Sequence, residues 1–284
     1  MSTRHDDRFF RVPRTTRVTS EGRVDLPILY YDTSNVVAVF EASREGAEHL
    51  LEGTGLEPAL ASGDRALAAM SFYEYRDTSV GTYNEVGLAI FAALRGRRWP
   101  RLGLAELYVP TRWRTSGAYV VDLPVTTRAA EAAGREIWGY PKFVTSISFR
   151  LRGRAFESTV LDPGGTAPIV TLSGQMGLGA LAPAPSLITF TMFQGALLRT
   201  EVTVRGAVTV HAPGGVRLSV GGSPHRMASH LRELDLSDAR PRLLLRTERF
   251  QSLLPLGRPA DNSRPMADSQ FPDRKSECQT SVMI

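Results

Sequence analysis

The stretch GREIWGYPKF, residues 134–143, contains Lys142, one of only two lysines among the 34 Lys and Arg residues of the chain. A lysine amine can attack a ketone to form an imine, whereas an arginine guanidinium stays charged and cannot. A Schiff-base lysine must be partly neutral near pH 7, although an ordinary lysine has a pKa of about 10.4. Apolar surroundings favour the neutral amine. Trp138, Tyr140 and Phe143 stand close to Lys142 in the sequence and predict such surroundings.

Helix and strand patterns flank this lysine on both sides. Residues 126–140 predict a helix with Thr127 as its N-cap and Gly134 near its end. Residues 26–42 alternate and are rich in β-branched and aromatic residues, which is typical of a strand. Similar strand patterns continue through most of the chain to about residue 258, with two further short helices predicted at 43–52 and 223–234. The sequence therefore predicts a β-rich α+β fold with many antiparallel strands and few short helices.

The composition is that of a folded domain in a reducing compartment. The chain is 42% apolar and 22% charged, and its one cysteine, Cys278, excludes an intrachain disulfide and a multi-cysteine metal site. No apolar run reaches the roughly 18 residues of a membrane helix. The charged N-terminal stretch has no secretory pattern. We therefore expect a cytoplasmic protein with no membrane partner.

A net charge of +5 is compatible with binding to nucleic acid. The arginines are spread along the chain, and the basic cluster RGRRWPR at 95–101 lies in turn-like sequence without a recognised binding motif. We interpret it as a solvated loop and expect no nucleic-acid partner. The five histidines show no metal-ligand spacing, so we predict that they are structural and that the protein has no metal site.

Three motifs in order resemble the acetoacetate decarboxylase superfamily. GREIWGYPKF resembles the family's Gly-Arg-Glu…Tyr-Pro-Lys stretch, in which the lysine forms an iminium with the substrate ketone. GRVDLPILYYDT (22–33) resembles the family's early strand, which opens with an active-site arginine and so identifies Arg23. YRDTSVGTYNEVG (75–87) resembles the stretch that carries an active-site glutamate and so identifies Glu85. The three motifs cover roughly residues 20 to 150, and beyond them the likeness is general.

The resemblance implies an antiparallel, barrel-like β core in a homo-oligomer, and Schiff-base decarboxylation of a small-molecule β-keto acid without a cofactor. Lys142 is then the nucleophile, Arg23 holds the substrate carboxylate, Glu85 orients groups or moves protons, and Tyr140 binds substrate. For Arg135 and Glu136 we predict structural roles. The domain organisation we expect is a flexible N-terminal arm at 1–20, the catalytic domain at 21–258 and a disordered C-terminal tail at 259–284.

The chain departs from the family pattern at two positions. Phe143 stands where acetoacetate decarboxylase has a second lysine, and we predict that it packs into the barrel wall, because adjacent residues of a strand point to opposite faces. A second family carboxylate would fall near Ser71, with Glu74 offset from it. These departures favour a substrate other than acetoacetate.

Two other functions remain open at the level of sequence. The same enamine chemistry could serve an aldolase-dehydratase that acts on pyruvate-like keto acids. Alternatively, a non-catalytic β-barrel could bind a small hydrophobic ligand, with Lys142 lining its pocket. A basic nucleic-acid-binding protein is the least favoured alternative function.

Overall fold

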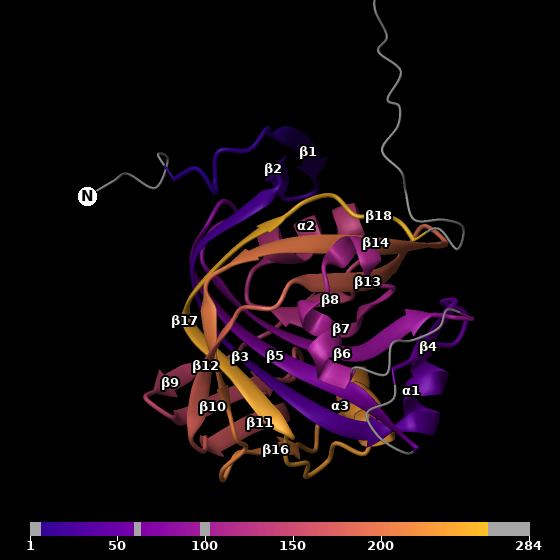
Figure 1. The fold of residues 1–284 in the computed structure, drawn as a ribbon, viewed down its shortest axis with the longest axis vertical. Coiled ribbons are helices and arrows are strands. Elements are labelled where there is room, and N and C mark those ends of the chain that lie inside the picture. The colour runs from indigo at the N-terminus through magenta and orange to yellow at the C-terminus, as the bar shows by residue number, and fades with distance from the viewer. Residues whose placement is uncertain (1–6, 60–63, 97–102, 261–284) are drawn as a thin grey trace, which may run out of the picture.

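A closed β-barrel forms the centre of the computed structural model, which describes residues 7–59, 64–96 and 103–260 (Figure 1). Seven strands close it in the order β17, β3, β5, β6, β7, β13 and β14, and β14 pairs again with β17. These strands are β3 (Ile28–Ser43), β5 (Arg65–Thr78), β6 (Tyr83–Leu94), β7 (Ser116–Val125), β13 (Leu187–Phe193), β14 (Ala196–Arg205) and β17 (Leu243–Leu254). The prediction of a β-rich, antiparallel barrel-like fold with few short helices is confirmed; within the seven-stranded barrel, β7 and β13 pair in parallel.

Strand β5 shows how the two faces of the barrel wall are assigned. Met70 and Phe72 point outward into the main hydrophobic core, whereas Tyr73 and Tyr75 point inward into a second cluster. The wall is buried on both faces because a four-stranded sheet covers part of its outside (Figure 1). That sheet consists of β9 (Arg150–Arg152), β10 (Ala155–Leu161), β11 (Pro168–Gln175) and β16 (Arg217–Val220).

Short elements complete the fold around the barrel. The helices are α1 (Arg44–Leu50), α2 (Arg128–Trp138) and α3 (Arg226–Glu233), with 3-10 turns η2 (Gly103–Tyr108) and η3 (Thr111–Trp113). The remaining strands are β1 (Thr15–Thr19), β2 (Gly22–Leu26), β4 (Leu56–Pro58), β8 (Lys142–Val144), β12 (Gly179–Pro183), β15 (Ala207–His211) and β18 (Arg258–Pro259). Among the described residues, no helix is long and apolar enough to cross a membrane.

The N-terminal segment contacts the barrel at one buried aromatic side chain. Phe10 is 8% exposed and contacts Leu29 and Leu253, and β1 pairs with β2. Burial of an aromatic side chain offsets part of the loss of chain entropy, and the flexibility of the arm at 1–20 stays a prediction. Residues 1–6, residues 97–102 of the basic loop and the predicted tail from 261 lie outside the described residues.

Helix α2 leads directly to the lysine strand β8. Thr127 caps its start as predicted, accepting a hydrogen bond from the backbone N–H of Ala130. The predicted range 126–140 contains the helix, but Gly134 lies inside it, since the helix continues to Trp138 and is capped by Gly139, whose φ is 68°. A left-handed backbone favours glycine and reverses the chain sharply. The glycine that ends the helix therefore also aims β8 into the barrel.

We predict that Gly139→Ala destabilises the protein. An added Cβ would lie 2.5 Å from the carbonyl oxygen of Met192, and a left-handed alanine by itself costs about 1–2 kcal/mol. Chemical denaturation should show a loss of at least that size. The control is Gly222→Ala, where an added Cβ meets nothing within 4 Å. Equal stability of the two variants would contradict the role of Gly139 as the hinge into β8.

Candidate active site

Lys142 and Glu85 form a buried ion pair inside the barrel. Strand β8 runs parallel to β7 with Lys142 beside Leu123, and β7 pairs in turn with β6, which carries Glu85. The lysine Nζ lies 2.6 Å from Oε2 of Glu85, and the two residues are 6% and 7% exposed. The structure thus brings together two of the residues that sequence reasoning selected, from segments separated by 57 positions.

Phe143 points away from this pair. It packs against the outer core, and its ring centroid lies 4.3 Å from that of His225, the N-cap residue of α3. The prediction that it packs into the barrel wall is confirmed. The side chain that follows the lysine therefore contributes to the outer layer.

Gly134 lies directly beneath the lysine side chain. An added Cβ at this position would come within 2.5 Å of both Cδ and Cε of Lys142. The glycine inside α2 therefore leaves room for the aliphatic stem of the lysine, although glycine costs the helix about 1 kcal/mol relative to alanine. The guanidinium of Arg135 also donates to the backbone oxygen of Lys142, at 3.2 Å, which ties α2 to β8.

Buried tyrosines surround the pair. The hydroxyl of Tyr75 donates to Oε1 of Glu85 at 3.3 Å, and the ring of Tyr83 lies 5.6 Å from Lys142 Nζ. Tyr30 and Tyr83 share a hydrogen bond of 3.2 Å. Burial, reinforced by the Glu85 carboxylate, raises the pKa of Tyr30, Tyr75 and Tyr83 well above the usual range. These phenols stay neutral and can donate hydrogen bonds near the amine.

Tyr140, predicted to bind substrate, lies in the same inner cluster. Its hydroxyl shares a 2.8 Å hydrogen bond with Oγ1 of Thr189 on β13, and burial raises its pKa to about 12. The ring of Trp138 lies 6.1 Å away. The position is compatible with a wall of the substrate site, and its contact with substrate stays a prediction.

Arg23 is not brought to the pair. It lies on β2, where Val24 and Leu26 enter the inner cluster and Arg23 points to the exposed face. No hydrogen bond or ion pair joins it to Lys142 or Glu85 in the described part of the chain. Its predicted role in holding the substrate carboxylate therefore stays a prediction without support from this arrangement.

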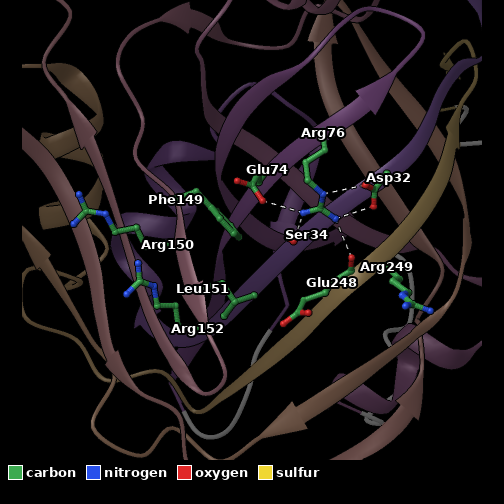
Figure 2. Close-up of a pocket in the computed structure, with 10 residues that line it drawn as sticks. All are labelled: Asp32, Ser34, Glu74, Arg76, Phe149, Arg150, Leu151, Arg152, Glu248 and Arg249. Atoms are coloured by element: carbon green, nitrogen blue, oxygen red, sulfur yellow. Dashed lines mark hydrogen bonds and ion pairs between the residues drawn. The ribbon is translucent and has the colours of Figure 1, made fainter.

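Ser71 and Glu74 lie on opposite faces of β5. Ser71 stands opposite Gly87 inside the barrel, where an added Cβ on the glycine would lie 2.7 Å from the serine Oγ. Glu74 lies outside, paired with Arg76 at 2.9 Å (Figure 2). The inner position near the pair therefore carries a neutral hydroxyl, and Glu74 does not replace the second family carboxylate.

Glu74 belongs to a charged pocket of about 560 Å³ on the outside of the barrel (Figure 2). Arg76 lies at its centre and makes a fork to Asp32 at 3.0 and 2.7 Å, with further bonds to Ser34, Glu74 and the backbone of Glu248. All five guanidinium N–H groups are thus used. Figure 2 shows Arg150 and Arg152 pointing away from this network. The network stabilises the outer wall and leaves Arg76 no donor for a ligand.

The inner tyrosines were missed as site residues by sequence reasoning. Their signal was present in the alternation of Tyr73 and Tyr75 around Glu74, followed by Tyr83 in the next strand. Aromatic residues at every second position of a strand are predicted to lie on the same face of the sheet. Only the closure of the barrel shows that this face surrounds the lysine.

The described residues thus form a closed barrel that encloses the buried Lys142–Glu85 pair. The family model for acetoacetate decarboxylase matches residues 12–212. The chain belongs to the acetoacetate decarboxylase family.

Solved structures show the same fold. An acetoacetate decarboxylase from Legionella pneumophila is 16% identical, with a TM-score of 0.60 over 88% of this chain and 92% of that chain. An acetoacetate decarboxylase-like enzyme from Sphingomonas wittichii is 13% identical, with a TM-score of 0.56 over 82% and 93%. The enduracididine biosynthesis enzyme MppR, complexed with pyruvate, is 15% identical, with a TM-score of 0.60 over 84% and 92%. None of the curated protein sequences matches this chain significantly.

We predict that Gly134→Ala reduces imine formation at Lys142 without unfolding the protein. Alanine favours the helix, but its Cβ displaces the lysine stem, and a 1 Å misplacement can cost about 100-fold in rate. Borohydride trapping of Lys142 with a small ketone measures the effect, with thermal unfolding recorded in parallel. Trapping at the wild-type rate would show that the close approach of Gly134 is dispensable.

The neutral phenols generate a prediction for alkaline pH. Because burial raises the pKa of Tyr30, Tyr75 and Tyr83 above the ordinary value of 10.0, their contribution to stability is complete below about pH 10 and is lost as pH rises further. At about pH 11 the folded protein should show little phenolate absorbance from these groups, with a sharp increase on unfolding. A full phenolate signal while the near-UV circular dichroism stays native would contradict their burial.

Proposed function

We propose that the protein is a Schiff-base decarboxylase of a β-keto acid, acetoacetate-like but different from acetoacetate itself. The single observation that carries this proposal is the hydrogen-bonded Lys142–Glu85 pair buried inside the barrel. A lysine at the surface would satisfy packing equally well. Burying its charge costs several kcal/mol of desolvation free energy, a cost we expect where the pair takes part in catalysis. Membership of the acetoacetate decarboxylase family supports the same chemistry.

The first step makes a neutral nucleophile. The proton on Lys142 Nζ moves along the 2.6 Å hydrogen bond to Oε2 of Glu85. An apolar site favours this transfer, because it replaces two buried charges by two neutral groups. The amine then attacks the ketone carbon, and Glu85 returns the proton as the hydroxyl of the carbinolamine leaves as water. The product is an iminium between Nζ and the former keto carbon.

The iminium then accepts the electrons of the carbon–carbon bond. The bond to the β-carboxylate breaks, CO2 leaves, and the electron pair forms an enamine that neutralises the nitrogen. Glu85 is ionised again at this stage, so it first takes up one proton from solvent, the proton that the decarboxylation consumes, and then passes it to the enamine carbon, which restores an iminium. Water hydrolyses it to the product ketone and frees the lysine. The neutral phenols around the pair exclude bulk water without adding a negative charge.

An aldolase-dehydratase acting on a pyruvate-like keto acid is the second candidate. It is favoured by the likeness in fold to MppR, whose structure contains pyruvate. The same iminium would lose a proton in place of CO2, and the enamine would attack an aldehyde. Both candidates therefore require Lys142, and they differ in whether CO2 is released.

We predict that borohydride reduction in the presence of substrate links keto acids to Lys142. Mass spectrometry of the peptide is unambiguous, since the chain has only one other lysine. Lys142→Arg should abolish the adduct and lower turnover by at least about 1000-fold, because a guanidinium forms no imine. Because arginine keeps the positive charge, the Lys142→Arg variant also controls for loss of charge in the barrel.

The same panel of β-keto acids, varied in chain length, should release CO2 with the wild-type enzyme. Imine adducts without CO2 from any member would favour the aldolase-dehydratase. A Lys142→Arg variant with full activity would overturn Schiff-base catalysis altogether and favour a barrel that merely binds its ligand.

A further inference from the structure

Two buried polar groups on β3 face the barrel interior without a partner. Asn35 is 3% exposed, and its Nδ2 has no hydrogen-bond partner among the residues that the structure describes. The hydroxyl of Thr33, two residues earlier, is buried and unpaired in the same way. Buried polar groups in native proteins are nearly always hydrogen-bonded. An unpaired amide donor in this position therefore points to a ligand.

Asn35 belongs to a row of side chains that ends at the Lys142–Glu85 pair. It stands opposite Tyr73 on β5, and Tyr73 stands opposite Glu85 on β6. Directly opposed residues of antiparallel strands project to the same face, so Asn35 faces the space that Lys142 enters. With adjacent strands about 4.8 Å apart, its backbone lies roughly 10 Å from that of Glu85. The side chains of both residues extend into that interval.

Between Thr247 and the Lys142–Glu85 pair, the row offers neutral groups only. Burial raises the pKa of Tyr73, and the Glu85 carboxylate raises it further, while polar contacts of its hydroxyl with the Ser71 and Asn35 side chains oppose the shift. The contact from Asn35 does not have hydrogen-bond geometry, so its Nδ2 remains available to a ligand. On the other side of Asn35, Thr247 of β17 is buried and accepts a hydrogen bond from the backbone of Arg249. A carboxylate buried against this row would lack a paired charge. The complementary ligand atom is therefore a neutral oxygen.

We propose that Asn35 Nδ2 donates a hydrogen bond to a neutral oxygen of the substrate, remote from the carbon that Lys142 attacks. The substrate class is then a β-keto acid whose chain carries a further carbonyl, hydroxyl or ether oxygen. Acetoacetate has no such oxygen. This assignment rests on the proposed function, since it takes Lys142 as the anchor of the keto carbon.

The test compares ketones that differ in one oxygen. The probes are methoxy-terminated methyl ketones with three or four methylenes between the two oxygen functions, and the unbranched methyl ketones in which a methylene replaces the ether oxygen. Ligand-observed NMR gives the dissociation constant of each ketone. For Asn35→Ala, we expect the ratio of ether to alkyl dissociation constants to rise about tenfold over wild type, the effect of one hydrogen bond.

Two further variants make the result specific to the Asn35 donor. Asn35→Asp keeps the side-chain shape but replaces the donor by an acceptor. It should raise the ratio of dissociation constants at least as much as Asn35→Ala does. It also provides the test if Asn35→Ala fails to fold. Ser34→Ala changes the adjacent residue, whose hydroxyl lies outside the barrel beside Arg76, and should leave the ratio unchanged.

The outcomes separate this inference from the proposed function. An unchanged ratio in both Asn35 variants overturns the assignment, as does a wild-type protein that binds neither kind of ketone. Borohydride trapping of the same ketones is the independent test of Lys142. If wild type binds the ketones but traps none, the Schiff-base proposal fails while the dissociation constants still decide the role of Asn35.

Discussion

The burial of one ion pair constrains the rest of this structure. Taking Lys142 and Glu85 out of water costs several kcal/mol for each ion, and only a short hydrogen bond with good supporting contacts offsets it. The barrel supplies those contacts through Tyr75, which donates to the carboxylate, and through a wall that excludes solvent. Removing one partner would leave a lone charge in the inner cluster, so the two residues are coupled in stability as well as in chemistry.

The alternation of strand residues separates the reacting groups from the groups that stabilise the wall. On β8, Lys142 points inward while Phe143 packs outside against His225. On β5, Tyr75 points inward while Arg76 holds an outer network with Asp32. A charged network on the outer face can therefore fix the position of the strands without adding charges to the site. The inner face keeps its neutral phenols because burial keeps them protonated.

The proposed chemistry is constrained more closely than the proposed substrate. A lysine and a carboxylate in hydrogen-bond contact are the groups that imine formation and hydrolysis would require. Recognition of the rest of the proposed substrate would depend on the inner face of β3 and β5, where Ser71 carries a neutral hydroxyl and Asn35 Nδ2 has no hydrogen-bond partner among the described residues.

The sequence by itself determined the class of fold, and it selected Lys142 and Glu85, which the structure brings into contact. Lys142 stands out because imine chemistry needs lysine where the chain otherwise uses arginine, and period-two patterns identify strands locally. Local patterns also located the N-cap Thr127, but they placed Gly134 near the helix end instead of inside α2, because the space under the lysine stem that requires Gly134 exists only in the packed structure.

Only the tertiary structure decided which strand faces line the barrel interior together. The exposure of Arg23, the outward position of Glu74 and the row from Asn35 to Glu85 all depend on strand register and on closure of the barrel. Register is a long-range property, since a shift of one residue moves every side chain of a strand to the other face. No local pattern in the chain carries that information.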